Sequence, residues 1–389
     1  MNLINMIFKI EVVINKFKGS ESERMADVNI LYIEEPEAHT HPQMQYIFIN
    51  NIKEILRKGI ENNNEKRDIQ FIISTHSSHI VSESEFDDIK YLKFEEDQIK
   101  SKNLKDLEAE YEKDGKEANY RFLKQYLTLN RSEIFFADKV VFIEGDTERI
   151  LLPSMMKKMD LKVNETSKKL LSQNISVIEV GSYVQIFEKF IDFIGIKTLI
   201  ITDIDSGMKL SVFKEMKKKL KGEKKKKLNQ KVRVDDQNAS VTTNSSLKFF
   251  YKTDELDYYK DKKVDDLILS KNENQDKEKS WQHDKEGYLL CAYQISEKNG
   301  DDISYHARSF EDAFIHLNKQ FIINNEKIFK SLKNFSDFSD DKNDAYCLAE
   351  SCIDKKPAFA IEILLSSDKE YSEWAIPEYI ERGLKWLRD

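Results

Sequence analysis

The chain has 389 residues, of which 40% are hydrophobic and 34% charged, and its formal net charge is −8 at pH 7. This length provides for two or three domains with their own cores, and the composition excludes a fibrous or largely disordered protein. The longest apolar runs are far below the roughly 18 residues that a membrane span requires, and the N-terminus lacks a secretory pattern. We therefore expect a cytoplasmic protein that has no membrane partner.

Helices and strands are predicted to alternate in the first part of the chain. Apolar side chains recur at helical spacing over residues 2–18 and 43–58, which favours a helix in each range. Short apolar runs at residues 28–33 and 71–75 are typical of buried strands. The resulting αβαβ order predicts a parallel sheet that is covered by helices.

A second α/β pattern follows a polar segment. Strands are predicted at residues 139–144, 175–180 and 198–203, and helices at residues 147–159 and 183–194. One helix between successive strands is the signature of a doubly wound parallel sheet. A C-terminal amphipathic helix is expected to begin after Pro377.

These patterns predict an α/β protein in three parts. We expect a first lobe over residues 1–95, a polar connector over residues 96–133 and a second domain over residues 134–389. Within the second domain, residues from about 208 to 300 show little apolar periodicity, and we interpret them as an insertion.

The stretch ILYIEEPEAHTHPQ ends an apolar strand in two carboxylates. One acidic side chain there can help to hold Mg²⁺, and a second can polarise a water that attacks a nucleotide phosphate. Glu34 and Glu35 occupy these positions, and His76 follows the next strand at the same sheet edge. The pattern favours nucleotide hydrolysis, and two solvated glutamates at a strand end are the alternative. The sequence contains no G-x-x-x-x-G-K-[ST] phosphate loop, so we expect the chain alone to bind ATP poorly or not at all.

Four further acidic residues follow strands of the second pattern. Glu144 and Glu148 lie in VVFIEGDTERI, where a strand turns into a helix, and Asp203 and Asp205 lie in LIITDID. Because parallel strands bring their carboxyl ends to one edge, we expect these carboxylates to lie together. They would repel one another unless divalent cations neutralised them, and oxygen ligands favour Mg²⁺, Mn²⁺ or Ca²⁺ over zinc. Two such ions roughly 3.5–4 Å apart could clamp the attacking and leaving oxygens of a phosphodiester.

These motifs resemble those of the OLD (overcoming lysogenization defect) family. EEPEAHTHPQ with IISTHSSHIV is similar to the Walker B, D-loop and switch-histidine block of the family's ABC-type ATPase domain, and the E-G-x-x-E and D-x-D pattern is similar to its TOPRIM nuclease domain. RSEIFFADKVVFIEGDTE, TTNSSLKFF, YHARSFEDAF and KKPAFAIEILL follow in the family's order. The resemblance implies a partial ABC-ATPase lobe followed by a TOPRIM (Rossmann-like, parallel sheet) domain with a helical C-terminal part.

The resemblance also implies roles for individual residues. Glu34 matches the magnesium-binding acidic residue, Glu35 the catalytic glutamate and His76 the switch histidine of the ATPase block. The chain then starts about where the second half of an ATPase domain would begin, without the Walker A half.

In the second domain, the four carboxylates match the residues that hold two Mg²⁺ or Mn²⁺ ions. Glu311 is implied as an additional metal ligand, with stabilisation of a helix N-terminus as the alternative. Lys356 is implied as a cation that neutralises charge on the scissile phosphate, and Lys355 beside it is the alternative.

A lysine-rich segment separates these motifs. Residues 209–233 carry twelve basic and two acidic side chains. A DNA-contacting arm and a solvated helix end with a loop are both compatible with this run. The candidate DNA-binding residues are Lys217, Lys218, Lys219, Lys224, Lys225, Lys226 and Lys227.

The resemblance implies a metal-dependent DNA endonuclease that nicks or cleaves phosphodiesters by a two-metal mechanism, in phage defence or DNA processing. Its partners would be DNA and either a second copy of the chain or a protein that supplies the Walker A half; ATP would bind only with that half. The alternative is a non-catalytic or regulatory subunit that binds DNA or a partner, with the ATPase half missing or supplied in trans. A primase or topoisomerase would share the TOPRIM fold, but no nucleophilic Tyr stands beside the motifs.

Overall fold

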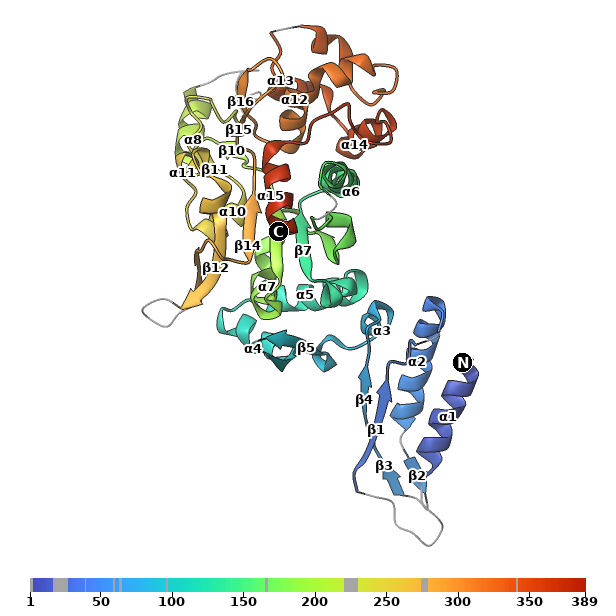
Figure 1. Cartoon of the computed structure of the whole chain (residues 1–389). Coiled ribbons are helices and arrows are strands. Elements are labelled where there is room, and N and C mark those ends of the chain that lie inside the picture. The colour runs from blue at the N-terminus through green and yellow to red at the C-terminus, as the bar shows by residue number, and fades with distance from the viewer. Residues whose placement is uncertain are drawn as a thin grey trace. The chain divides into compact units, whose positions relative to one another are not determined.

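The fold was analysed in a computed structural model, in which the chain divides into two compact units, residues 1–136 and 137–389 (Figure 1). The structure describes residues 3–16, 27–38, 40–58, 60–62, 65–95, 97–164, 167–219, 230–273, 279–340 and 342–389. Both units combine helices with parallel and antiparallel strand pairs, and a parallel pair or group is central to each, which confirms the predicted α/β class. Within these ranges no helix is long and apolar enough to cross a membrane.

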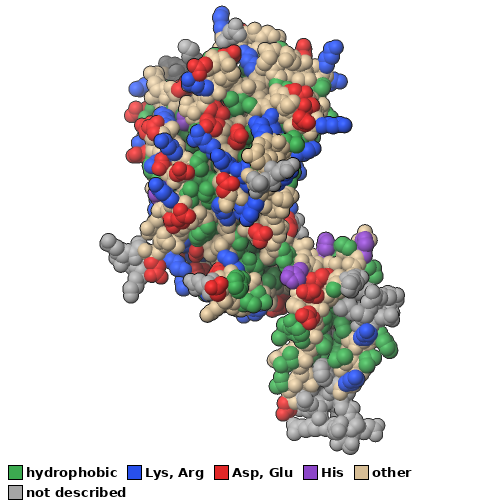
Figure 2. Space-filling view, viewed as in Figure 1, with side chains coloured by type: hydrophobic (Ala, Val, Ile, Leu, Met, Phe, Trp, Pro, Cys, Tyr) green, Lys and Arg blue, Asp and Glu red, His purple; other side chains and the backbone are tan. Residues whose placement is uncertain are grey.

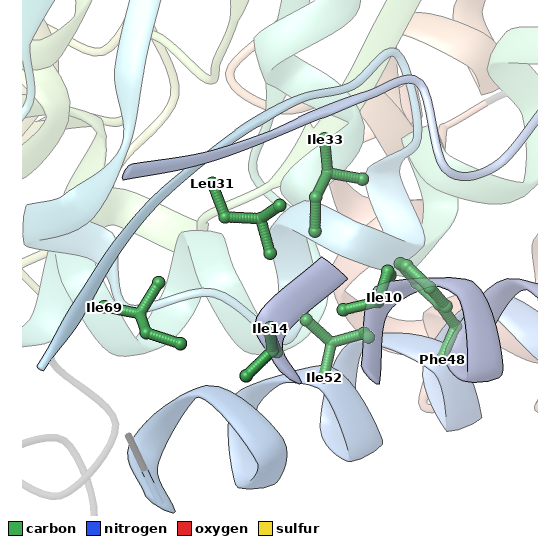
Figure 3. Packing of buried hydrophobic residues seen from close by; sticks show 7 residues of the cluster. All are labelled: Ile10, Ile14, Leu31, Ile33, Phe48, Ile52 and Ile69. Carbon is green, nitrogen blue, oxygen red and sulfur yellow. The ribbon is translucent and has the colours of Figure 1, made fainter. Parts of the chain in front are cut away.

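Two helices cover one face of a two-stranded parallel sheet in the first unit. The strands are β1 (Asn29–Glu34) and β4 (Ile69–Ser74), and the helices are α1 (Leu3–Lys16) and α2 (Pro42–Lys58). All four elements were predicted, with boundaries that differ by three residues or fewer. Figure 3 shows the apolar side chains that fill the space between the helices and the sheet, which are Ile10, Ile14, Leu31, Ile33, Phe48, Ile52 and Ile69.

The remainder of the first unit includes the range that was interpreted as a connector. Its elements are β2 (Ile60–Asn62), β3 (Glu65–Arg67), α3 (Ser78–Ser82), η1 (Phe86–Asp88), β5 (Lys90–Glu95), β6 (Gln98–Asn103), α4 (Asp106–Lys113), α5 (Glu117–Asn130) and η2 (Ser132–Phe136). Residues 96–133 thus contribute a strand and two helices, which differs from the expectation of a linking segment. The reason is that Tyr120, Leu123 and Leu127 recur on one face of α5 and are buried, with Tyr120 against Phe86.

A six-stranded sheet organises the second unit. Its order is β13 (Lys279–His283), β12 (Ile268–Glu273), β14 (Leu289–Ala292), β9 (Lys197–Ile201), β7 (Lys139–Ile143) and β8 (Ile175–Glu179). The four strands from β14 to β8 are parallel to their neighbours, and β12 runs antiparallel to β13 and β14. The predicted strands β7, β8 and β9 are therefore confirmed as a parallel group.

Three of these strands lie within the range that was interpreted as an insertion. Residues 268–292 supply β12, β13 and β14, and β14 pairs with β9 at the centre of the sheet. The run LLCA that forms β14 has only four residues, all buried, and a tyrosine stands on each side of it. A run of this length carries too little periodicity to be recognised as a central strand.

Helices and short strands complete the second unit. They are α6 (Asp146–Leu161), η3 (Leu170–Ser172), η4 (Gly181–Phe187), α7 (Glu188–Ile194), β10 (Ser206–Gly207), α8 (Leu210–Lys219), β11 (Val241–Thr242), α10 (Ser245–Tyr251), α11 (Leu256–Lys260), η5 (Val264–Leu267), β15 (Ser296–Lys298), β16 (Ser304–His306), α12 (Phe310–Asn324), η6 (Phe335–Ser339), α13 (Ala345–Cys352), α14 (Lys356–Leu365) and α15 (Glu378–Arg388). The predicted C-terminal helix after Pro377 is confirmed as α15.

A buried ion network attaches the β12–β13 hairpin to α7. Lys271 Nζ lies 2.5 Å from Glu188 Oε1 and 3.5 Å from Asp192 Oδ2. Trp281 Nε1 donates to Glu188 Oε1 at 3.2 Å, and the Tyr288 hydroxyl donates to Asp192 Oδ1 at 2.9 Å. Because the side chains of Lys271 and Glu188 are only 10% and 9% exposed, loss of the Lys271 charge would leave Glu188 buried without its counter-ion.

We expect Lys271→Met to lower the free energy of unfolding by about 3–5 kcal/mol, because Glu188 and Asp192 would lose their cation. Chemical denaturation of the two proteins at neutral pH measures this difference. Lys333→Met is the matched control, since the Lys333–Asp354 pair is 60% and 56% exposed and should contribute at most about 1 kcal/mol. Equal effects of the two substitutions would contradict a stabilising role for the buried network.

A buried carboxyl group holds the start of α15. Glu297 is 9% exposed, and its Oε2 accepts a hydrogen bond from the Glu378 N–H at 3.0 Å. Burial raises the pKa of Glu297 from its ordinary 4.5 to about 7, although this hydrogen bond lowers it. Between these two values the folded chain keeps a proton that the unfolded chain has lost. The contribution of Glu297 to stability is therefore complete below pH 4.5 and is lost as the pH rises through 7.

Glu297→Gln should remove this pH dependence, since a neutral amide can still accept the Glu378 hydrogen bond. The variant is expected to gain roughly 1–3 kcal/mol of unfolding free energy relative to wild type between pH 5 and pH 8. Urea denaturation at both pH values tests this, with the exposed Glu286→Gln as a control of unchanged pH dependence. A constant difference between Glu297→Gln and wild type at the two pH values would refute it.

Candidate active site

The acidic residues of the second unit meet where the strand order reverses. β8 and β9 lie on opposite sides of β7, so the chain changes direction across the sheet at the β7–β9 pair. Ile143 and Ile201 are register partners at the carboxyl ends of these strands. Glu144 follows Ile143 directly and Asp203 stands two residues after Ile201, so both lie at the crevice where open α/β sheets bind ligands.

Two cavities adjoin at this edge, and together they contain every carboxylate that was predicted for the site. Glu144, Glu148, Asp203, Glu311 and Lys356 line a cavity of about 730 Å³. A smaller cavity of about 300 Å³ shares four of these residues, all except Glu148, and adds Asp205. Residues that stand up to 212 positions apart in the sequence, Glu144 and Lys356, are thus brought to one place.

Mutual repulsion and burial act together on these carboxylates. Burial and the charge of Glu311 raise the pKa of Glu148 to about 8. Burial also raises the pKa of Asp203 well above its ordinary value, and the charges of Glu144 and Glu311 raise it further. Burial raises the pKa of Glu144 as well, against the hydrogen bonds from Thr202 and Asn244. A divalent cation would relieve this repulsion, so the all-oxygen donor set fits Mg²⁺ or Mn²⁺ in charge and in chemistry.

Basic side chains already neutralise two of the acidic groups. Lys356 Nζ lies 2.8 Å from Glu311 Oε2, and Arg308, which is 4% exposed, pairs with Asp205. Partial burial lowers the pKa of Lys356, but the charge of Glu311 outweighs it and leaves the pKa above its ordinary value. Over the described ranges no three Asp, Glu, His or Cys side chains are grouped as a ready-made metal-binding set.

The two candidate lysines differ in their contacts. Lys356 is the first residue of α14 and makes the ion pair with Glu311, whereas Lys355 is the N-cap residue and only lines the larger cavity. Glu311 lies in the first turn of α12, is 3% exposed, and accepts a further hydrogen bond from the Thr147 hydroxyl at 3.4 Å.

Polar residues that the sequence analysis did not single out hold Glu144 and Asp203. Asn244 Nδ2 donates to Glu144 Oε1 at 2.8 Å, and the Thr202 hydroxyl donates to the same oxygen. Gln294 Nε2 donates to Asp203 Oδ1 at 2.6 Å. Asn244 precedes Ser-Ser-Leu at the start of a helix, a local N-cap signal, but nothing local indicates that its other side reaches a carboxylate.

The candidate ATPase residues come together at the carboxyl end of the β1–β4 pair. Glu34 and Ser74 are register partners, and the Glu35 N–H donates to the Ser74 carbonyl at 2.9 Å. Glu35 Oε1 lies 3.4 Å from His76 Nε2, and the two side chains are 50% and 82% exposed. Glu37 Oε1 accepts the His76 N–H at 2.5 Å. Glu35 and His76 thus lie close together at this sheet edge, and Glu34 is exposed at the strand end.

The lysine-rich segment is only partly described. Lys217, Lys218 and Lys219 form the exposed last turn of α8, and Lys217 Nζ lies 5.1 Å from the centre of the Phe213 ring. The candidate residues Lys224, Lys225, Lys226 and Lys227 lie outside the described residues.

Two family models match separate parts of the chain. The family model of the AAA ATPase domain matches residues 1–81, and that of the overcoming lysogenization defect protein-like TOPRIM domain matches residues 135–205. Endonuclease GajA from Bacillus cereus (strain HuB5-5) is 28% identical over 393 residues, which cover 95% of this chain and 50% of that protein. The Old nuclease of Escherichia phage P2 is 27% identical over 194 residues, covering 49% of this chain and 30% of that protein.

Among solved structures, the C-terminal region of the Burkholderia pseudomallei OLD protein aligns with 65% of this chain and 98% of that chain, at 18% identity and a TM-score of 0.32. The chain spans about half the length of GajA and less of the Old nuclease. The chain thus combines a segment similar to an AAA ATPase domain with an OLD-like TOPRIM domain, and it is similar to two proteins that are named as nucleases.

Proposed function

We propose that this chain is a divalent-cation-dependent DNA endonuclease whose active site is the cavity beside Glu144 and Asp203. The observation that carries the proposal is the gathering of buried, mutually repelling carboxylates opposite Lys356 at the switch point of the sheet. Both curated relatives are named as nucleases, which supports DNA as the substrate. Phage defence or DNA processing is proposed as the setting from the family resemblance.

Acidic and basic side chains are proposed to have different roles in this reaction. Glu144, Glu148, Asp203 and Asp205, with Glu311 as an additional ligand, are proposed to hold two Mg²⁺ or Mn²⁺ ions. When bound, these cations supply Lewis-acid polarisation of the phosphodiester and of water. Lys356 is proposed to neutralise charge that develops on the scissile phosphate, because its ammonium group faces the same cavity.

The first unit is proposed to be an incomplete ATPase lobe that works with another polypeptide. Strands of parallel sheets are normally covered on both faces, yet Ile30, Tyr32 and Ile72 are 54%, 58% and 56% exposed on the uncovered face of the β1–β4 pair. Hydrophobic side chains are visible on the surface of this unit in Figure 2. We propose that a second copy of the chain, or a partner that carries the phosphate loop, covers this face and supplies the missing ATP contacts.

A non-catalytic subunit that binds DNA or a partner is the second candidate. The pairing of Asp205 with Arg308 and of Glu311 with Lys356 favours it, because both acidic groups are neutralised without a metal ion. The uncovered apolar face of the first unit is also compatible with this function.

The endonuclease proposal predicts that the purified chain nicks supercoiled plasmid in the presence of Mn²⁺. Asp203→Ala should reduce the rate by at least about 100-fold, because it removes a proposed metal ligand, whereas loss of a residue that only hydrogen-bonds to a ligand typically costs less. Asp257→Ala is the matched control, because the Asp257 side chain is 89% exposed and pairs only with Lys260 in the described structure. Gel analysis of relaxed and linear plasmid measures the rates. If wild type and Asp203→Ala are equally inert, the chain is not a nuclease on its own and the second candidate is favoured.

The incomplete ATPase lobe predicts no ATP turnover above background by the purified chain. No G-x-x-x-x-G-K-[ST] loop is present to provide backbone N–H groups for the phosphates. Phosphate release is the measurement, and Glu35→Gln serves as the comparison. Turnover that is abolished by Glu35→Gln would show that this unit binds and hydrolyses ATP unaided.

A further inference from the structure

We propose that Asn244 and Gln294, together with Thr202, are positioning residues that orient Glu144 and Asp203 for a divalent cation by neutral hydrogen bonds to one oxygen of each carboxylate. The inference rests on the proposed metal-dependent function and extends it to residues that do not touch the cation. All three side chains are nearly inaccessible, with exposed fractions of 2%, 1% and 1% for Asn244, Gln294 and Thr202.

The orientation of the Asn244 amide is determined by its backbone neighbours. Its Oδ1 accepts hydrogen bonds from the N–H groups of Ser246 and Leu247 at 2.9 and 3.0 Å, where it caps α10. Because those two groups can only donate, the amide NH₂ must point to the other side. There it lies 2.8 Å from Glu144 Oε1, 2.7 Å from Thr202 Oγ1 and 2.9 Å from the Asp203 carbonyl oxygen.

The same argument determines the orientation of Gln294. Its Oε1 accepts the Ile204 N–H at 2.7 Å, which directs the NH₂ to Asp203 Oδ1 at 2.6 Å and to the Tyr379 hydroxyl at 3.1 Å. The Phe310 N–H donates to the same Oδ1 at 3.0 Å. The amide is thus fully engaged, and it connects Asp203 and Ile204, which follow β9, with the C-terminal helix α15.

These side-chain donors meet one oxygen of each carboxylate, Oε1 of Glu144 and Oδ1 of Asp203. A carboxylate offers about four lone-pair sites on its two oxygens, so such bonds restrain the group while leaving capacity for a cation. Networks of this kind fix the geometry of ligands and are worth roughly 10–100-fold in metal affinity.

The donors to Glu144 and Asp203 also differ in charge from those at the edge of the site. Asp205 and Glu311 are paired with the cationic groups of Arg308 and Lys356, whereas the side-chain donors to Glu144 and Asp203 are amides and a hydroxyl. An amide orients a carboxylate without cancelling its charge. The ionised forms of Glu144 and Asp203 therefore offer a divalent cation their full negative charge, which a lysine or arginine in place of Asn244 or Gln294 would cancel.

Mn²⁺ binding to the full chain, measured by isothermal titration calorimetry without DNA, tests the proposal. Asn244→Ser is the decisive variant, because serine is an equally good N-cap residue for α10 but is too short to reach Glu144. Thr202→Val is the second variant, since it is nearly isosteric and removes the hydroxyl donor. Each is expected to weaken Mn²⁺ binding by about 10–100-fold.

Matched controls carry the same substitutions at buried positions away from the carboxylates. Asn318 is 4% exposed and donates to the carbonyl oxygens of Phe314 and Ala375. Thr198 is 0% exposed, lies at the opposite end of β9 from Asp203, and donates to the Ile196 carbonyl oxygen. Asn318→Ser and Thr198→Val should lower thermal stability at least as much as the test variants and leave Mn²⁺ affinity close to wild type.

The outcomes are distinguishable. Weakened Mn²⁺ binding by Asn244→Ser and Thr202→Val, but not by the controls, supports the positioning role. Unchanged affinity in the two test variants overturns it, and so does a loss of affinity that follows thermal stability across all four variants, or a wild type that binds no Mn²⁺. If wild type binds Mn²⁺ but cleaves no plasmid, the proposed endonuclease function fails while the positioning role is still judged by the affinities.

Discussion

Repulsion among acidic side chains at the carboxyl edge of β7 and β9 is the constraint on which the second unit depends. A sheet edge that gathers Glu144, Glu148, Asp203 and Glu311 in one cavity is unfavourable without compensating groups. Burial raises the pKa values of Glu144, Glu148 and Asp203, and the charges of neighbouring carboxylates raise them further. This unfavourable burial of acidic groups is the physical basis for proposing a divalent cation at this sheet edge.

The compensating groups come from elements that follow the carboxylates in the chain. Asn244 begins α10, Gln294 follows β14, Glu311 begins α12 and Lys356 begins α14. Strand β14 pairs with β9, and this pairing brings Gln294 beside Asp203. Strand β14, which comes late in the sequence, therefore contributes both to the sheet and to the site. The buried Lys271 network supports the same arrangement from the far side of β14, where it holds the outer hairpin on α7.

The first unit presents the opposite situation, with apolar groups exposed where a sheet would normally be covered. Alternate residues of β1 are buried under α1 and α2, and the others lie on the uncovered face. Its polar end brings Glu35 and His76 together at an exposed edge of the sheet. The two units therefore differ in their unfavourable feature: the second gathers acidic side chains in one cavity, and the first exposes apolar side chains on one face of its sheet.

Local patterns determined much of this protein. Apolar spacing was sufficient for α1, α2 and the strands β1, β4, β7, β8 and β9, because burial of one face imposes a period that the sequence must carry. Carboxylates at the ends of two parallel strands were likewise sufficient to predict that Glu144 and Asp203 meet, since parallel strands share a carboxyl edge.

Tertiary structure alone decided the membership of β14 in the central sheet, the packing of residues 96–133 into the first unit, and the partners of each carboxylate. Hydrogen bonds from Asn244 to Glu144, from Gln294 to Asp203 and from Phe310 to Asp203 join residues that are 100, 91 and 107 positions apart. Hydrophobic periodicity records which face of an element is buried, but it contains nothing about which distant polar group will arrive there. Those partners are determined only when the strands pair and bring polar groups from distant parts of the sequence beside the buried carboxylates.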